Sequence, residues 1–284
     1  GDQASVITAD GRKYTINAVN ADGSVRCDSN LTWVQILASS YGKGFPECPL
    51  SAETSAPASR ILARSGATAG GTHEFDLAQQ VTRQLELPAD AGGGIMSNDL
   101  VSVLAGTNDV VGAYERFEAG EIDEAAALAL AEQAGVAIAT QVNRLADAGA
   151  RVLITTVPDV SLTPYGRSKT VAGTARLSYL TARVNAKLLV TIDNDGRRIG
   201  LIELNPYLIA VVSNPPAYGY RNVRDAACVP VDPLQCTTAT LRENEDGSSA
   251  SSTTWLWASE LQLSPGGHAQ LGSLAQSRAR NQPF

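Results

Sequence analysis

Short apolar runs alternate with longer amphipathic segments through the middle of the chain. Three runs, 100–105, 151–157 and 199–204, have the length and the apolar, β-branched character of strands that are buried on both faces. The segments between them, 121–148 and 171–192, carry apolar residues at helical spacing. We therefore predict the order strand, helix, strand, helix, strand, which gives a parallel sheet with helices on both faces.

The flanking regions carry weaker patterns. The pattern predicts two further helices, at 79–87 and at 32–42, the second ended by a glycine. The region 214–252 is rich in loop residues and contains the polar excursion "ENEDGSSASS". No internal repeat and no break in composition divides the chain, so we predict one α/β domain over residues 1–284.

Composition and charge narrow the functional classes. Of the 284 residues, 44% are hydrophobic and 18% are charged, which is typical of a globular protein. The net charge of −7 and the absence of any Lys/Arg cluster argue against a nucleic-acid partner. No run approaches the ~18 uninterrupted apolar residues of a transmembrane helix, so we expect no membrane-spanning segment.

The four cysteines form two local pairs, and neither pair has the spacing of a metal-binding motif. We predict the disulfides Cys27–Cys48 and Cys228–Cys236, and hence an oxidising compartment. The alternative is four free thiols in a cytosolic protein. The two histidines of the chain lie far from both cysteine pairs, so we expect no zinc site.

Two loops carry the candidate chemistry. The strand at 100–105 runs into Gly106-Thr107-Asn108-Asp109, at the edge of the sheet where ligands bind in such folds. There the Asn108 amide can donate hydrogen bonds as an oxyanion hole requires, although a plain turn would use the same residues. The second loop, "ARSGATAGG" at 63–71, packs small residues around Gly66, which lets a backbone N–H approach a ligand closely.

Together these loops resemble two sequence blocks of the SGNH (GDSL) hydrolase family. "SGAT" at 65–68 is similar to the second block, with Gly66 as the backbone oxyanion donor, and "GTND" at 106–109 is similar to the third, with Asn108 as the side-chain donor. The strand-end loop 157–166, the segments 214–228 and 235–241, and the closing segment 255–275 resemble the bacterial secreted esterase and lipase subgroup.

This resemblance implies a fold, a chemistry and a location. The implied fold is a flavodoxin-like three-layer sandwich, and the implied activity is hydrolysis of a small-molecule or lipid ester by a serine nucleophile. It implies neither a metal nor an organic cofactor. Together with the predicted disulfides, it implies a secreted or periplasmic protein.

The chain departs from the family where the base and its acid belong. The family's aspartate position in the fifth block is Ser259, and the histidine position is Gln262. A glutamine cannot take up a proton near neutral pH and so cannot act as general base. His268 is the remaining candidate base, but the position three residues before it is Pro265, so we favour a structural role for His268.

The nucleophile position is also unmatched. The chain opens with Gly1-Asp2-Gln3, which resembles the family's Gly-Asp-Ser motif with glutamine in place of serine. The segment "GRKYTIN", at 11–17, follows too soon for that alignment, and no strand precedes Gly1. We therefore expect the nucleophile block and the first strand to lie upstream of Gly1, unless other residues replace that strand.

Three interpretations of the function follow. The first is an exported carboxylic ester hydrolase of the GDSL type. The second is a degenerate relative that binds an ester or acyl ligand without turnover, which the loss of both acid and base in one motif favours. The third is an altered form of an active enzyme, because Ser259 and Gln262 are polar and small enough for a pocket built for Asp and His.

Overall fold

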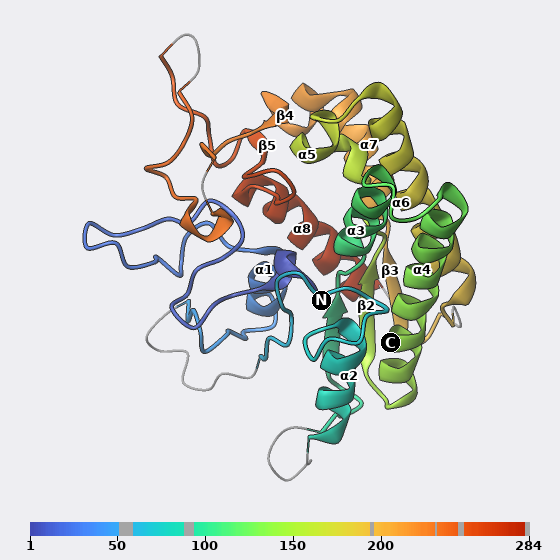
Figure 1. Cartoon of the computed structure of the whole chain (residues 1–284). Coiled ribbons are helices and arrows are strands. Elements are labelled where there is room, and N and C mark those ends of the chain that lie inside the picture. Colours follow the sequence, from blue (N-terminus) through green and yellow to red (C-terminus); the bar gives the residue numbers. More distant parts are fainter. Residues whose placement is uncertain (51–58, 88–93, 194–195, 231, 244–246, 282–284) are drawn as a thin grey trace.

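In the part of the chain that the structure describes, three parallel strands form the sheet at the centre of the molecule, in the order β1-β2-β3 (Figure 1). They span Leu100–Val103, Arg151–Thr155 and Ile199–Ile202. The register places Val101 beside Val152 and Val152 beside Ile199. The computed structural model describes residues 1–284 except 51–58, 88–93, 194–195, 231, 244–246 and 282–284.

Within the described residues, eight α-helices surround this sheet, and some of them connect its strands. Their bounds are α1 (Trp33–Ser39), α2 (Leu77–Glu86), α3 (Thr107–Glu118), α4 (Glu124–Asp147), α5 (Pro164–Arg167), α6 (Val171–Thr191), α7 (Leu204–Ser213) and α8 (Pro265–Asn281). Short 3-10 turns lie at η1 (Gln3–Ser5), η3 (Val160–Leu162), η4 (Pro215–Tyr218) and η5 (Pro233–Gln235). A separate parallel pair is formed by β4 (Asn222–Ala226) and β5 (Trp255–Trp257).

Alternate side chains along each strand pack into two hydrophobic cores, one on each face of the sheet. Val152 and Ile154 pack into the core formed with α2, α3, α4 and α6. Leu153, between them, packs into the core formed with α1, α7 and α8. This alternation explains why the strands are apolar at nearly every position, as strands covered on both faces must be. The predicted α/β architecture, with helices on both faces, is confirmed.

Local signals explain where the long helices begin and end. The Asp123 side chain accepts a hydrogen bond from the backbone N–H of Ala126 at the start of α4, and Thr170 caps α6 in the same way. After α4 the chain turns at Gly149, whose φ of +106° is accessible to glycine at little cost. The helices predicted at 121–148 and 171–192 are therefore confirmed to within three residues at each end.

Helix α4 is long and apolar enough to cross a membrane by length and composition alone. Ten of its residues, Ile138 and Val142 among them, are nevertheless buried, and the helix packs along α6 (Figure 1). We therefore interpret α4 as a core helix, whose buried face needs apolar residues in any globular protein.

Three local predictions were wrong. Residues 107–109 do not continue a loop but form the first turn of α3, and Leu204 does not end a strand but begins α7. The region predicted as loop-rich contains β4, whose partner β5 lies about thirty residues further along the chain. Part of "ENEDGSSASS" lies outside the described residues.

Both predicted disulfides are present, Cys27–Cys48 and Cys228–Cys236. They close loops outside the central sheet, over separations of 21 and 8 residues. Such bonds are typical of proteins from oxidising compartments.

Candidate functional site

The loop after β1 is shaped by one glycine. Gly106 has a φ of +112°, and a Cβ at this position would lie 2.7 Å from Cγ2 of Val157, so both the backbone and the packing require glycine. The turn places Asn108 in the first turn of α3, at the carboxyl end of β1. This is the position that the strand pattern predicted for Asn108.

The side chain of Asn108 is engaged by two protein acceptors. Its Nδ2 donates to Oε1 of Gln3 at 2.9 Å and to the carbonyl of Ala67 at 2.8 Å. In return, Nε2 of Gln3 donates to Oδ1 of Asn108 at 3.2 Å, so the two amides form a reciprocal pair. A carboxamide carries two N–H donors, and both are used here.

This pair brings the N-terminus to the candidate site. We assigned Gln3 no role from the sequence, because we expected the nucleophile block to lie upstream of Gly1. The structure places Gln3 beside Asn108 at the end of the central sheet. Only the likeness of Gly1-Asp2-Gln3 to Gly-Asp-Ser, which we discounted, could have identified Gln3 from the sequence.

Gly66 lies in the loop next to this pair. Its φ is +76°, it is exposed, and no atom lies within 4 Å of a Cβ built on it. The carbonyl that binds Asn108 belongs to the following residue, Ala67. The two loops singled out in the sequence are therefore neighbours, with the Gly66 backbone open to solvent beside the amide pair.

Asp109 fastens these two loops together. Its two carboxylate oxygens each lie 3.0 Å from the backbone nitrogen of Ala69, which donates to them. Burial raises the pKa of Asp109 to about 6, against the opposing effect of that hydrogen bond. Asp109 therefore braces the loop that carries Gly66.

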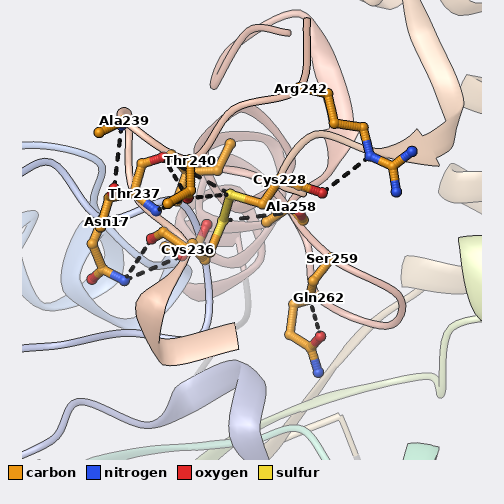
Figure 2. The surroundings of a disulfide bond; sticks show 12 residues. Asn17, Cys228, Cys236, Thr237, Ala239, Thr240, Arg242, Ala258, Ser259 and Gln262 are labelled. Atoms are coloured by element: carbon orange, nitrogen blue, oxygen red, sulfur yellow. Dashed lines mark hydrogen bonds between the residues drawn. A yellow bond between two sulfur atoms is a disulfide. The ribbon is translucent and has the colours of Figure 1, made fainter. Parts of the chain in front are cut away.

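Ser259 and Gln262 face each other at the turn after β5. The Ser259 hydroxyl donates to Oε1 of Gln262, as Figure 2 shows, and the Gln262 carbonyl accepts from the backbone N–H of Ala258 at 2.8 Å. The Cys228–Cys236 disulfide lies beside the turn, where the Cys228 N–H donates to the Ala258 carbonyl at 3.0 Å. The disulfide thus supports the segment that carries both positions.

Gln3 and Gln262 line the same small cavity. Its volume is about 30 Å³, which is room for a single water molecule. Apart from these two glutamines and Asp2, most of its lining is apolar: Leu104, Leu204, Trp257, Leu261 and Leu263 are among its residues. Gln3 and Gln262 are both buried, with exposed fractions of 7% and 9%. Two glutamines that are far apart in the sequence therefore lie together at this end of the sheet.

The comparison with protein families decides the identity of this arrangement. The family model described as GDSL-like Lipase/Acylhydrolase matches residues 7–242, well over half of the chain. The chain belongs to this family. A search of the curated proteins found no match. The matched range contains Gly66 and Asn108, whereas Gln3, Ser259 and Gln262 lie outside it.

Membership in the GDSL family supports a general ester hydrolase function, whose chemistry needs a nucleophile, a base and an oriented acid. In this member, the structure brings together Gln3, Asn108 and the loop of Gly66, and brings Ser259 to Gln262. None of these side chains is a hydroxyl paired with an imidazole. Among the described residues, no group of three His, Cys, Asp or Glu could hold a metal ion.

His268, the other candidate base in this GDSL-family protein, accepts a hydrogen bond at the start of helix α1. It is completely buried, and its Nδ1 accepts the backbone N–H of Trp33, the first residue of α1, at 3.3 Å. Burial, helped by the charge of Lys13, lowers the pKa of His268 to about 3. His268 does not line the cavity shared by Gln3 and Gln262, and this placement agrees with the structural role that we favoured.

The brace formed by Asp109 can be tested by substitution. We expect Asp109→Ala to lower the free energy of unfolding by about 2 kcal/mol, because the buried N–H of Ala69 loses its acceptor. Asp109→Asn keeps one acceptor oxygen and should cost less than half as much. Urea unfolding at pH 7.5 measures both changes. Equal losses for the two variants would show that Asp109 acts through its charge rather than through this bond.

Proposed function

We propose that this GDSL-family protein is exported and binds an ester or acyl ligand at the Gln3–Asn108 site without hydrolysing it. The observation that carries the proposal is the reciprocal amide pair, because it occupies both N–H donors of Asn108 and the side chain beside Asn108 is a glutamine, which cannot act as a nucleophile. The two disulfides support an oxidising, extracytoplasmic location.

The nucleophile, the base and the acid that a serine hydrolase reaction needs are all absent from these positions. Gln3 has no hydroxyl to attack a carbonyl, and Gln262 has no nitrogen that can take up a proton near neutral pH. Ser259 cannot stabilise an imidazolium as a carboxylate does, and no imidazole lies beside it to be oriented. The three departures belong to one mechanism, and this favours loss of turnover over a change of substrate.

The expected rate is correspondingly small. Removing one member of a catalytic triad costs about 10⁴- to 10⁶-fold, and the residual catalysis of about 10³- to 10⁴-fold over water comes from the oxyanion hole and substrate binding. Because the N–H donors of Asn108 are already bonded to Gln3 and to the Ala67 carbonyl, we expect this remaining activity to be lower still.

Ligand recognition can survive these losses. A ligand carbonyl that displaces Gln3 would accept the same Nδ2 hydrogen of Asn108, so one amide acceptor is exchanged for another. The exposed loop of Gly66 lies beside that position and is open to the polar head of a small ester. This arrangement supports a small-molecule or lipid ester as the ligand.

A fluorophosphonate probe tests the absence of turnover, because it labels an activated serine irrespective of substrate. We expect the intact mass of the folded protein to be unchanged after prolonged incubation with the probe. A stoichiometric adduct on any serine would overturn the proposal and restore the hydrolase interpretation.

Calorimetric titration with ethyl esters from acetate to octanoate tests binding. We expect heat of binding for at least one ester, and at least tenfold weaker binding by Asn108→Ala, which removes the shared donor. Ser24→Ala, in an exposed loop, is the matched control. Failure of every ester to bind the unaltered protein would contradict the ligand assignment.

A further inference from the structure

The outer face of helix α6 is apolar along its whole length. The exposed residues of this 21-residue helix, which we call the α6 face, are all apolar: Val171, Ala172, Ala175, Tyr179, Ala182, Ala186, Leu189 and Val190. Val171 and Val190, at its two ends, are 90% and 79% exposed. A helix that faces water normally carries charged and polar residues on that side, so the α6 face has the character of a contact surface.

Helix α4 extends this surface on one side of α6. Between Ala125 and Thr140, the exposed residues of α4 are all uncharged: Ala125, Ala129, Gln133, Val136 and Thr140. Of the nine large apolar side chains that are exposed among the described residues, five lie on α4 or α6. Packing inside the chain explains the buried residues of these two helices, but it does not explain the exposed ones.

The cationic side chains of α6 turn away from the α6 face. Arg176 lies 3.6 Å from the carboxylate of Glu118 on α3. Arg183 and Lys187 both pair with Glu132 on α4. The positive charges of α6 are thus neutralised within one chain, and a partner of the α6 face need not supply carboxylates.

The spacing of the α6 face is that of a helix made to pack against another helix. The positions 172, 175, 179, 182, 186 and 189 follow one another at alternating steps of three and four residues. These steps give the 3.5-residue period with which two helices stay in contact along their length. The partner predicted by this spacing is therefore a long helix.

The sizes of these side chains favour α6 of a second copy, in antiparallel orientation. A two-fold axis through the middle of the face brings together the pairs Tyr179 with Ala182, Leu189 with Ala172, and Ala175 with Ala186. Each large side chain then meets an alanine of the other copy, and the two surfaces interlock. A parallel pair would instead set Tyr179 against Tyr179 and leave gaps between the alanines.

The area of the surface is sufficient for a stable dimer. A helix of 21 residues is about 31 Å long and a layer of two helices is about 20 Å wide, so α4 and α6 offer roughly 600 Å² on each copy. Two copies would bury roughly 1,200 Å², the lower end of the range for specific interfaces.

We propose that the α6 face is the interface of a two-fold symmetric dimer of this chain, in which α6 packs antiparallel against α6 of the second copy. Helix α4 of each copy flanks the contact. The interface does not include Gln3, Asn108 or the loop of Gly66, so each copy keeps its own candidate site.

A bilayer surface fits the α6 face less well. Helices that lie on a bilayer insert large apolar side chains and carry cations that reach the lipid headgroups. Half of the α6 face is alanine, and the cations of α6 are paired with glutamates. Alanine gains little from contact with lipid, whereas small side chains let two helix backbones approach closely.

Sedimentation velocity of the 284-residue protein, from micromolar to sub-millimolar concentration, tests the dimer. Ala182→Glu places a carboxylate at the centre of the interface, and Ala269→Glu makes the same change at an exposed position of α8 as the control. We expect the unaltered protein and the control to dimerise. Ala182→Glu should weaken dimerisation on the order of 100-fold, because two carboxylates would lose their hydration without a partner. Circular dichroism spectra verify that each variant is folded.

A mixture of two variants tests the antiparallel arrangement. Tyr179→Lys should also dissociate the dimer, but an equimolar mixture of Tyr179→Lys with Ala182→Glu should associate again. In the mixed dimer the new ammonium group at position 179 lies opposite the new carboxylate at position 182, and the native contact of Tyr179 with Ala182 is kept on the other side of the axis. A mixture that stays monomeric would overturn the arrangement.

Other outcomes would overturn the dimer itself. An unaltered protein that is monomeric over the whole concentration range would do so, and so would a dimer that Ala182→Glu leaves intact. Flotation of a monomeric protein with neutral phosphatidylcholine vesicles would overturn the proposal in favour of a bilayer surface. The readouts involve no ester ligand and no turnover, so failure here would be distinct from failure of the proposed function.

Discussion

The triple variant Gln3→Ser, Ser259→Asp, Gln262→His is expected to hydrolyse aryl esters on the order of 10³-fold faster than the unaltered protein. The first change supplies the nucleophile and also releases Asn108 as an oxyanion donor. The other two place an imidazole and an orienting carboxylate at positions that already contact each other. Initial rates with p-nitrophenyl acetate, and the fluorophosphonate adduct on residue 3, measure the gain.

The single variants are the controls for this gain. Gln3→Ser alone lacks a base, and Gln262→His alone lacks a nucleophile, so each should stay within about tenfold of the unaltered protein because triad residues act as a unit. The pH–rate profile of the triple variant should show one group titrating near the ordinary histidine pKa of about 6.5. If the triple variant folds and stays as inactive as the singles, then the geometry at Gln3 and Gln262 does not correspond to that of a hydrolase.

His268→Gln is expected to change how stability depends on pH. The folded-state pKa of His268, about 3, lies below its unfolded value, so its contribution is complete above pH 6.5 and is lost as the pH falls toward 3. We expect the variant to be less stable at pH 8 through lost packing at the start of α1. The difference should then shrink by about 1.4 kcal/mol for each pH unit below 6.5.

Urea unfolding of both proteins at pH 8, 6, 5 and 4 gives this difference directly. Asp2 and Asp109 titrate in the same range with the opposite sign, since burial raises the pKa of each to about 6. Both proteins carry these two carboxyls, so their effect cancels in the comparison. Parallel stability curves for the two proteins would show that His268 does not stay neutral in the folded state.

The central architecture could be predicted from the sequence because its signals are local. A strand covered on both faces is apolar at nearly every position, and a long helix shows its spacing and its caps within its own residues. The strand pairs that escaped prediction, β4 with β5, join segments about thirty residues apart. The residues of β4 alone do not distinguish it from a loop, because it becomes a strand only by pairing with β5.

The same difference between local signals and long-range contacts decides which site residues could be predicted. Asn108 and Gly66 could be identified because each lies in a loop whose small residues and position after an apolar run are visible locally. Gln3 was missed, because its role depends on a contact with Asn108 across 105 residues of chain. The contact between Ser259 and Gln262 spans three residues, and the resemblance of that segment was enough to find both.

The amide pair between Gln3 and Asn108 also bears on how such a protein could gain catalysis by mutation. Gln3→Ser alone would break two hydrogen bonds and yield no reaction, since Gln262 cannot act as a base. Gln262→His alone would be equally silent. Natural selection would therefore meet no rewarded single-mutation intermediate on the way to catalysis.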